Sequence, residues 1–84
     1  MDRHEVKERI RRFMLESYPH DGRVLEDETA LLEEWFVDSI GIVLTVAFLE
    51  ETFGIDIRSA DVIQENFRSV GTLAEFVCAR LGRV

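Results

Sequence analysis

The stretch DSIGIVLTVAFLEETFG, residues 38–54, decides the fold that this sequence predicts. It predicts a helix over residues 39–53, because a side-chain oxygen of Asp38 or Ser39 can accept from the unpaired N–H groups that begin a helix. Gly54 is suited to end this helix, since glycine adopts the left-handed conformation without strain. Two apolar stripes run along the helix: Ile40, Val43 or Leu44, Ala47 and Phe48 form one, and Ile42, Val46, Leu49 and Phe53 form the other.

A helix that is apolar on nearly every side normally lies at the centre of a bundle. In a chain of 84 residues the neighbouring elements are too few to cover it completely. We therefore expect part of the stripe that begins at Ile40 to stay exposed beside Ser39, where it would suit the docking of a partner.

Amphipathic helices are predicted on both sides of this central helix. Apolar residues at helical spacing predict one over about residues 2–17 and another near the end of the chain, closed by Gly82. The start of that last helix is ambiguous, because either Ser69 caps it or Thr72 and Glu75 form a capping box. The apolar positions of the two helices are Val6, Ile10, Phe13 and Met14, and Val70, Leu73, Ala74, Val77 and Leu81.

The remaining segments predict a long loop and one short helix. Residues 19–37 have no regular period, and the short helix is expected over roughly residues 60–66. The apolar residues expected to anchor the loop to the core are Val24, Leu25, Leu31, Leu32, Trp35 and Phe36. The sequence thus predicts an all-α fold, a four-helix bundle of three longer helices and one short helix with a long first loop, in which residues 1–84 form a single domain.

Composition excludes several classes of protein. A hydrophobic share of 46% with one proline is not that of a disordered chain. A single cysteine, Cys78, excludes a disulfide framework and any multi-cysteine metal site. The chain begins without the pattern of a signal peptide, and its longest apolar stretch, residues 40–49, is too short to span a bilayer. We therefore expect a soluble, cytoplasmic protein that does not insert into membranes.

The formal net charge of −7 comes from the middle of the chain. Residues 25–57 hold nine acidic side chains and no basic ones. The negative electrostatic field of these carboxylates repels phosphate backbones, so we expect no binding to nucleic acid. It attracts basic protein surfaces or cations, or it serves only to keep the protein soluble.

Few groups in this sequence could catalyse a reaction. His4 and His20 stand in terminal and turn contexts that are typical of the solvated surface. Cys78 lies in an apolar run typical of buried packing. There is no glycine-rich phosphate loop and no spacing typical of metal ligands. We therefore predict that the chain is not an enzyme and holds no metal.

The sequence resembles the acyl carrier protein family over essentially its whole length. The likeness rests on VDSIGIVL, residues 37–44, on FLEETFGI, residues 48–55, and on NFRSV, residues 66–70, together with the first helix and the long loop. The resemblance implies that Ser39, with Asp38 as its motif neighbour, receives 4′-phosphopantetheine from coenzyme A through a magnesium-dependent phosphopantetheinyl transferase. It further implies that the thiol of this arm holds acyl or aminoacyl groups as thioesters.

The resemblance also implies which partners the protein meets. They are the transferase, an acyl- or aminoacyl-loading ligase, and synthase or transferase enzymes of fatty acid, polyketide, specialised lipid or secondary metabolite biosynthesis. The partner face is expected at Ile40, Val43, Ala47, Glu50 and Glu51.

The departures from the family pattern narrow the type of carrier. Gly41 and Leu44 stand where carriers of ordinary fatty acid synthesis favour acidic residues, so the chain looks more like a free-standing carrier of a specialised pathway. We expect a monomer. The alternative is a small helical interaction domain that is never modified, in which Ser39 is only a helix cap; exposure of Ser39 discriminates between the two.

Overall fold

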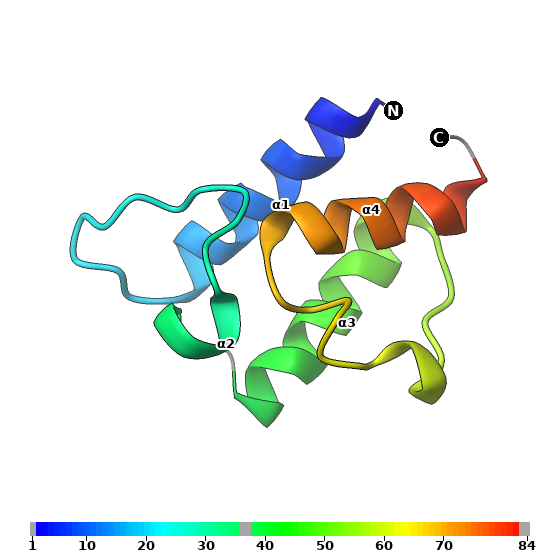
Figure 1. Cartoon of the computed structure of the whole chain (residues 1–84). Helices are drawn as coiled ribbons and strands as arrows, with labels where there is room; N and C mark the ends of the chain where they lie inside the picture. Colours follow the sequence, from blue (N-terminus) through cyan, green and yellow to red (C-terminus); the bar gives the residue numbers. More distant parts are fainter. Residues whose placement is uncertain (1, 36–37, 83–84) are drawn as a thin grey trace.

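The computed structural model of the chain describes residues 2–35 and 38–82. Its elements are α1 (Arg3–Ser17), α2 (Leu31–Glu34), α3 (Ser39–Phe53), the 3-10 helix η1 (Ser59–Asp61) and α4 (Val70–Leu81). No strand occurs among these residues, so the predicted all-α fold with three longer helices and one short helix is confirmed. Figure 1 shows α4 packed across α1, with α3 beneath them and the long first loop to one side.

Polar side chains mark the starts of α1 and α4. The Asp2 carboxylate accepts from the Glu5 N–H at 2.8 Å and begins α1. At α4, the Ser69 hydroxyl accepts from the Thr72 N–H at 3.2 Å, and the Ser69 N–H donates to the Thr72 hydroxyl at 3.0 Å. Ser69 is therefore the cap of α4, and the alternative start with Thr72 and Glu75 is wrong.

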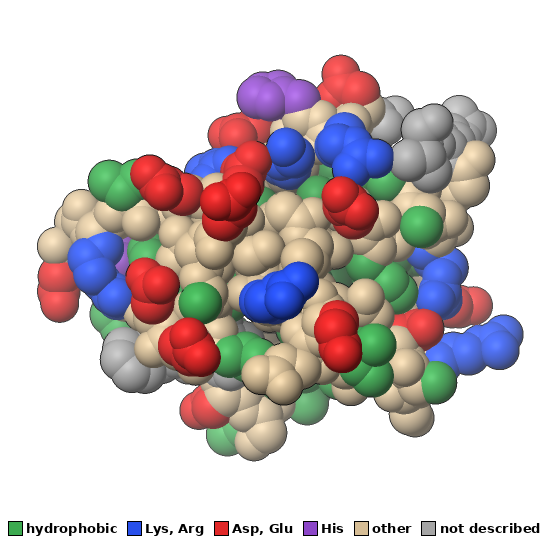
Figure 2. Space-filling model, in the orientation of Figure 1, with side chains coloured by type: hydrophobic (Ala, Val, Ile, Leu, Met, Phe, Trp, Pro, Cys, Tyr) green, Lys and Arg blue, Asp and Glu red, His purple; other side chains and the backbone are tan. Residues whose placement is uncertain are grey.

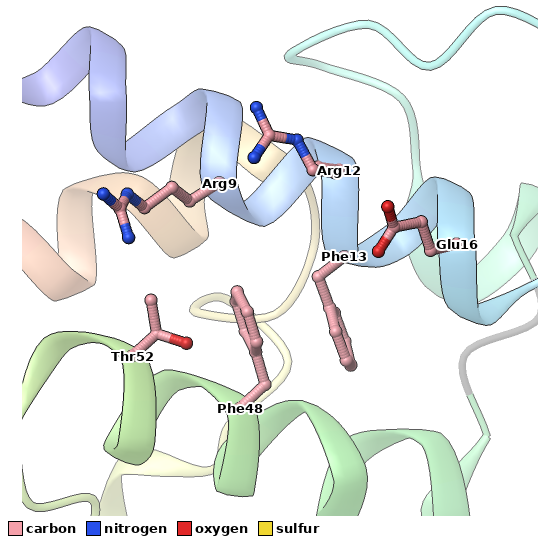
Figure 3. A pocket seen from close by; sticks show the side chains of 6 residues that line it. All are labelled: Arg9, Arg12, Phe13, Glu16, Phe48 and Thr52. Carbon is pink, nitrogen blue, oxygen red and sulfur yellow. The ribbon is translucent and has the colours of Figure 1, made fainter.

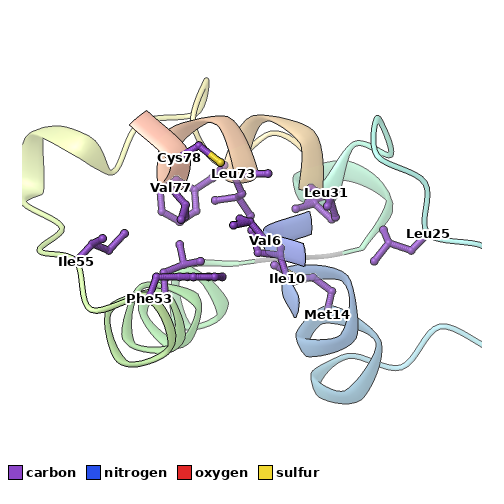
Figure 4. Packing of buried hydrophobic residues seen from close by; sticks show 14 of the residues in the cluster. Val6, Ile10, Met14, Leu25, Leu31, Phe53, Ile55, Leu73, Val77 and Cys78 are labelled. Atoms are coloured by element: carbon purple, nitrogen blue, oxygen red, sulfur yellow. The ribbon is translucent and has the colours of Figure 1, made fainter. Parts of the chain in front are cut away.

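One hydrophobic core joins the helices, and α1 and α4 share the most extensive contact. Figure 4 shows how buried side chains from α1, α4 and the end of α3 meet between these elements. The fully or almost fully buried apolar residues are Val6, Ile10, Met14, Leu25, Leu31, Trp35, Leu49, Phe53, Ile55, Phe67, Val70, Leu73, Ala74, Val77 and Cys78. The expectation that Cys78 is a buried packing residue is confirmed.

The first loop is anchored to the core, but not at every expected residue. Leu25, Leu31 and Trp35 are buried and Leu32 is partly buried. Val24 is 75% exposed, so its prediction as an anchor is wrong. Phe36, the last expected anchor, lies outside the described residues.

Two local predictions need correction. Residues 31–34 form α2 inside the expected loop: the Trp35 N–H donates to the Leu31 carbonyl at 3.1 Å, and this single helical turn brings the buried Leu31 and Trp35 to one side. The short helix expected at 60–66 is instead η1 followed by turns. The carbonyl of Asp61 accepts from the Ile63 N–H at 2.9 Å and from the Asn66 side chain at 2.8 Å, and this tight turn stops the helix.

One carboxylate of the acidic middle of the chain, that of Asp27, has basic neighbours in space. The Asp27 carboxylate accepts from Arg11 and, at 3.1 Å, from Lys7, and both cations lie on α1. These hydrogen bonds, that of Arg11 first, lower the pKa of Asp27 below its ordinary value. Figure 2 shows acidic and basic side chains interspersed over the face in view. In the described part of the chain, no helix combines the length and apolar character needed to cross a membrane.

Candidate functional site

Ser39 is the first residue of α3, and its side chain is exposed. The helix cap is the residue before it: the Asp38 carboxylate accepts from the Gly41 N–H at 2.8 Å. Within the described residues, the Ser39 hydroxyl makes no hydrogen bond. Of the two possible caps, Asp38 therefore fills the role, and the Ser39 oxygen is left facing solvent.

The environment of Ser39 suits a phosphodiester. A helix of 15 residues carries a partial positive charge at its N-terminus, where anions are stabilised. The neighbouring Asp38 carboxylate is directed at the Gly41 N–H rather than at the Ser39 oxygen. An exposed hydroxyl on the first turn of a helix can bear a long substituent without disturbing the core.

An exposed apolar face continues from Ser39 along α3. We call Ile40, Val43, Leu44 and Ala47 the α3 face. The exposed fractions of Ile40, Val43 and Leu44 are 70%, 66% and 55%. The expectation that the stripe beginning at Ile40 stays partly uncovered is confirmed. Apolar side chains reach the surface at the lower edge of Figure 2, near the start of α3.

The acidic end of α3 is divided between two roles. Glu51 is exposed on the same side of the helix as the α3 face. Glu50 is half-buried, and its carboxylate accepts from the Ile57 N–H at 2.9 Å, which ties the segment after α3 to the helix. Glu50 therefore lies at the edge of this surface with its carboxylate already engaged.

Gly41 is not part of the exposed surface. It is buried on the core side of α3, so of the two positions where fatty acid carriers favour acids only Leu44 lies on the exposed face. The sequence reasoning also missed Thr45, which is fully buried and whose hydroxyl donates to the Gly41 carbonyl at 2.7 Å. The available signal was the one hydroxyl residue in the apolar stretch 40–49, four residues after Gly41.

The candidate catalytic groups are scattered. His4 is exposed on α1, whereas His20 is half-buried and stacks on Trp35 with a ring-centroid distance of 5.8 Å. The expectation of a solvated His20 is therefore wrong, because this aromatic contact covers the ring. Across residues 2–35 and 38–82, no three His, Cys, Asp or Glu side chains are grouped so as to hold a metal ion.

Comparison with known proteins identifies the family. The profile of the family described as "Phosphopantetheine attachment site" matches residues 8–77, which include α3 with Asp38 and Ser39 and most of α1 and α4. A comparison with curated proteins finds no match. Carrier domains of this kind are non-catalytic and interact with modifying and synthase enzymes. The chain belongs to the family of phosphopantetheine-bearing carrier proteins, and its prosthetic group is covalent 4′-phosphopantetheine.

Proposed function

We propose that this protein carries acyl or aminoacyl groups as thioesters on a 4′-phosphopantetheine arm attached to Ser39. The observation that carries the proposal is the exposed hydroxyl of Ser39 at the start of α3, free of the capping role that Asp38 performs. When bound, the arm supplies a thiol on a long flexible chain. Asp38 holds the first turn of α3 in place and presents its charge beside the serine during modification.

The chain itself acts as a carrier and not as an enzyme under this proposal, with residues 1–84 as one carrier domain. Support comes from the buried position of its only cysteine, Cys78, which leaves no exposed thiol nucleophile on the protein. The single core that joins α1, α3 and α4 supports one domain.

We assign partner recognition to the α3 face, with Glu51 beside it and Glu50 at its edge. Exposed apolar side chains favour burial against a complementary surface, and a nearby carboxylate speeds encounter with a basic one. The partners are a phosphopantetheinyl transferase, a loading ligase and synthase or transferase enzymes. Leu44 presents an exposed apolar side chain, which a partner groove shaped to bind a carboxylate does not complement. This favours dedicated partners of a specialised pathway over those of general fatty acid synthesis.

The alternative function is an unmodified interaction domain in which Ser39 serves only as a cap. The Asp38 hydrogen bond to Gly41 argues against it, because the capping position is already filled.

Intact mass measurement tests the carrier function. The protein is produced in cells that contain a broad-specificity transferase and is measured before and after hydroxylamine, which cleaves thioesters. A carrier shows the arm, and an acyl fraction that hydroxylamine removes. A mass equal to that of the unmodified chain under both conditions supports the interaction domain instead.

A further inference from the structure

Thr45 is a hydroxyl residue on the core side of α3. Its side chain is fully buried, on the same side of the helix as Leu49 and Phe53. The hydroxyl donates to the Gly41 carbonyl at 2.7 Å, and this carbonyl is also the helical acceptor of the Thr45 N–H. Removal of the hydroxyl therefore leaves no buried acceptor without a donor. A valine of nearly the same shape would fill the position without burying a polar group, so the core itself does not require the hydroxyl.

The hydrogen bond of Thr45 leads to the turn that carries Ser39. The Gly41 carbonyl and the Ile42 N–H belong to one peptide group, and that N–H donates to the Asp38 carbonyl at 2.8 Å. The Asp38 carbonyl and the Ser39 N–H belong to the next peptide group in the series. These groups form a chain of aligned donors and acceptors that starts at the buried Thr45 hydroxyl and ends at the Ser39 N–H.

The open end of this chain is a donor with no acceptor inside the helix. The Ser39 N–H is one of the first four N–H groups of α3, which have no carbonyl of the helix to bind. The Asp38 carboxylate is engaged with the Gly41 N–H at 2.8 Å. Hydrogen bonds in series polarise one another, so the Thr45 hydroxyl strengthens the Ser39 N–H as a donor and holds the peptide plane next to the serine side chain.

We propose that Thr45 is a positioning residue for the attachment of phosphopantetheine, acting on Ser39 through the peptide groups of the first turn of α3. The proposal rests on Ser39 as the attachment site. In the transfer, the Ser39 oxygen forms a bond to the phosphorus of the phosphopantetheine half of coenzyme A, and the pyrophosphate bond to the nucleotide half breaks. The serine proton passes to the transferase or to solvent, and adenosine 3′,5′-bisphosphate leaves.

The contribution of Thr45 to this step is electrostatic and geometric. A more strongly polarised Ser39 N–H stabilises negative charge on the phosphoryl group that becomes bound to the neighbouring serine oxygen. The buried Thr45 has this effect without touching coenzyme A or the transferase. Its loss should therefore slow the transfer and leave the docking of the transferase unchanged.

The kinetics of modification test the proposal. Thr45→Val removes the hydroxyl and keeps the shape, whereas Thr45→Ser keeps the hydroxyl. Initial rates are measured by intact mass over a range of concentrations of the full chain, with coenzyme A, magnesium and a broad-specificity transferase. We expect Thr45→Val to lower kcat about two- to tenfold, as the loss of one hydrogen bond would, with KM unchanged. Thr45→Ser should restore most of the rate.

Thr52→Val is the matched control, because it makes the same substitution on the same helix. Thr52 is half-buried near the other end of α3, where it lines the groove between α1 and α3 that Figure 3 shows. We expect wild-type kcat and KM for this variant. Thermal melts separate the proposed role from a merely structural one, since Thr45→Val should melt at or above the wild-type temperature while its modification slows.

Amide proton shifts give a readout that does not depend on the transferase. In the unmodified protein, Thr45→Val should move the amide protons of Ile42 and Ser39 upfield, because both lose polarisation, and Thr52→Val should move neither. A wild-type kcat for Thr45→Val, or a rate that falls only in step with the melting temperature, would overturn this inference while the wild type still gains the arm. A wild type that gains no arm would overturn the proposed function, and this inference with it.

Discussion

Asp38 allows the stability of α3 to be separated from recognition of the modification site. Its carboxylate accepts from the Gly41 N–H at 2.8 Å and satisfies one of the unpaired donors at the helix start. Replacing such a cap by alanine costs about 0.5–2 kcal/mol, and because Asp38 is exposed we expect about 1 kcal/mol for Asp38→Ala. For a domain of this size, that loss lowers the melting temperature by about 4–8 °C.

The matched variant is Asp38→Asn, which keeps the cap and removes the charge. Asparagine caps as well as aspartate, so only the interaction with the helix dipole is lost, about 0.3–1 kcal/mol. Thermal melts followed by circular dichroism measure stability, and timed mass spectra with coenzyme A, magnesium and the transferase measure modification. We expect Asp38→Asn to lose less melting temperature than Asp38→Ala and yet to be modified more slowly than the wild type. An Asp38→Ala variant as stable as wild type would refute the capping argument, and wild-type modification of Asp38→Asn would refute a role for the charge.

Three further predictions concern stability. Leu49→Ala leaves a cavity at a fully buried position and should lower the free energy of unfolding, measured with denaturant, by about 2–5 kcal/mol. Leu44→Ala on the exposed face should change it by no more than about 0.5 kcal/mol, and equal losses would contradict the core assignment. The hydrogen bonds of Arg11 and then Lys7 lower the pKa of Asp27, so its carboxylate stabilises the fold at pH values above the ordinary aspartate pKa of about 3.9. This contribution to the free energy of unfolding is lost as the pH falls through the lower pKa of the folded state. From pH 5 downward, Asp27→Asn should therefore lose less stability than the wild type, and an equal loss would contradict the argument. Raising the ionic strength to about 0.15 M, where the screening length is about 8 Å, should raise the melting temperature because the net charge of −7 repels itself, and a steady fall would show that the ion pairs dominate.

The helices whose bounds can be predicted from the sequence are those with recognisable capping residues at their ends. The bounds of α3 follow from Asp38 at one end and Gly54, at φ +67°, at the other. The single turn of α2 has no such mark, because it forms through tertiary burial of Leu31 and Trp35. One-turn elements of this kind have too little local signal for sequence reasoning to find.

The candidate site divides in the same way. The position of Ser39 at the start of a helix follows from the sequence, and so does the exposed apolar stripe beside it. The orientation of α3 about its own axis does not follow from the sequence, because in a helix that is apolar on nearly every side the pattern does not indicate which side faces the core. For this reason the burial of Gly41 and the stacking of Phe48 on Phe13 become visible only in the structure.

The central claim is that Ser39 carries the arm, and one measurement tests it most directly. The purified chain, Ser39→Ala and Ser59→Ala are each incubated with coenzyme A, magnesium and a broad-specificity transferase, and their intact masses are recorded. Ser59 is the matched control, because it too is an exposed serine at the first position of a helical turn. The account predicts one added phosphopantetheinyl mass on wild type and Ser59→Ala, and none on a Ser39→Ala variant whose helical circular dichroism is unchanged. Modification that persists in Ser39→Ala would contradict it.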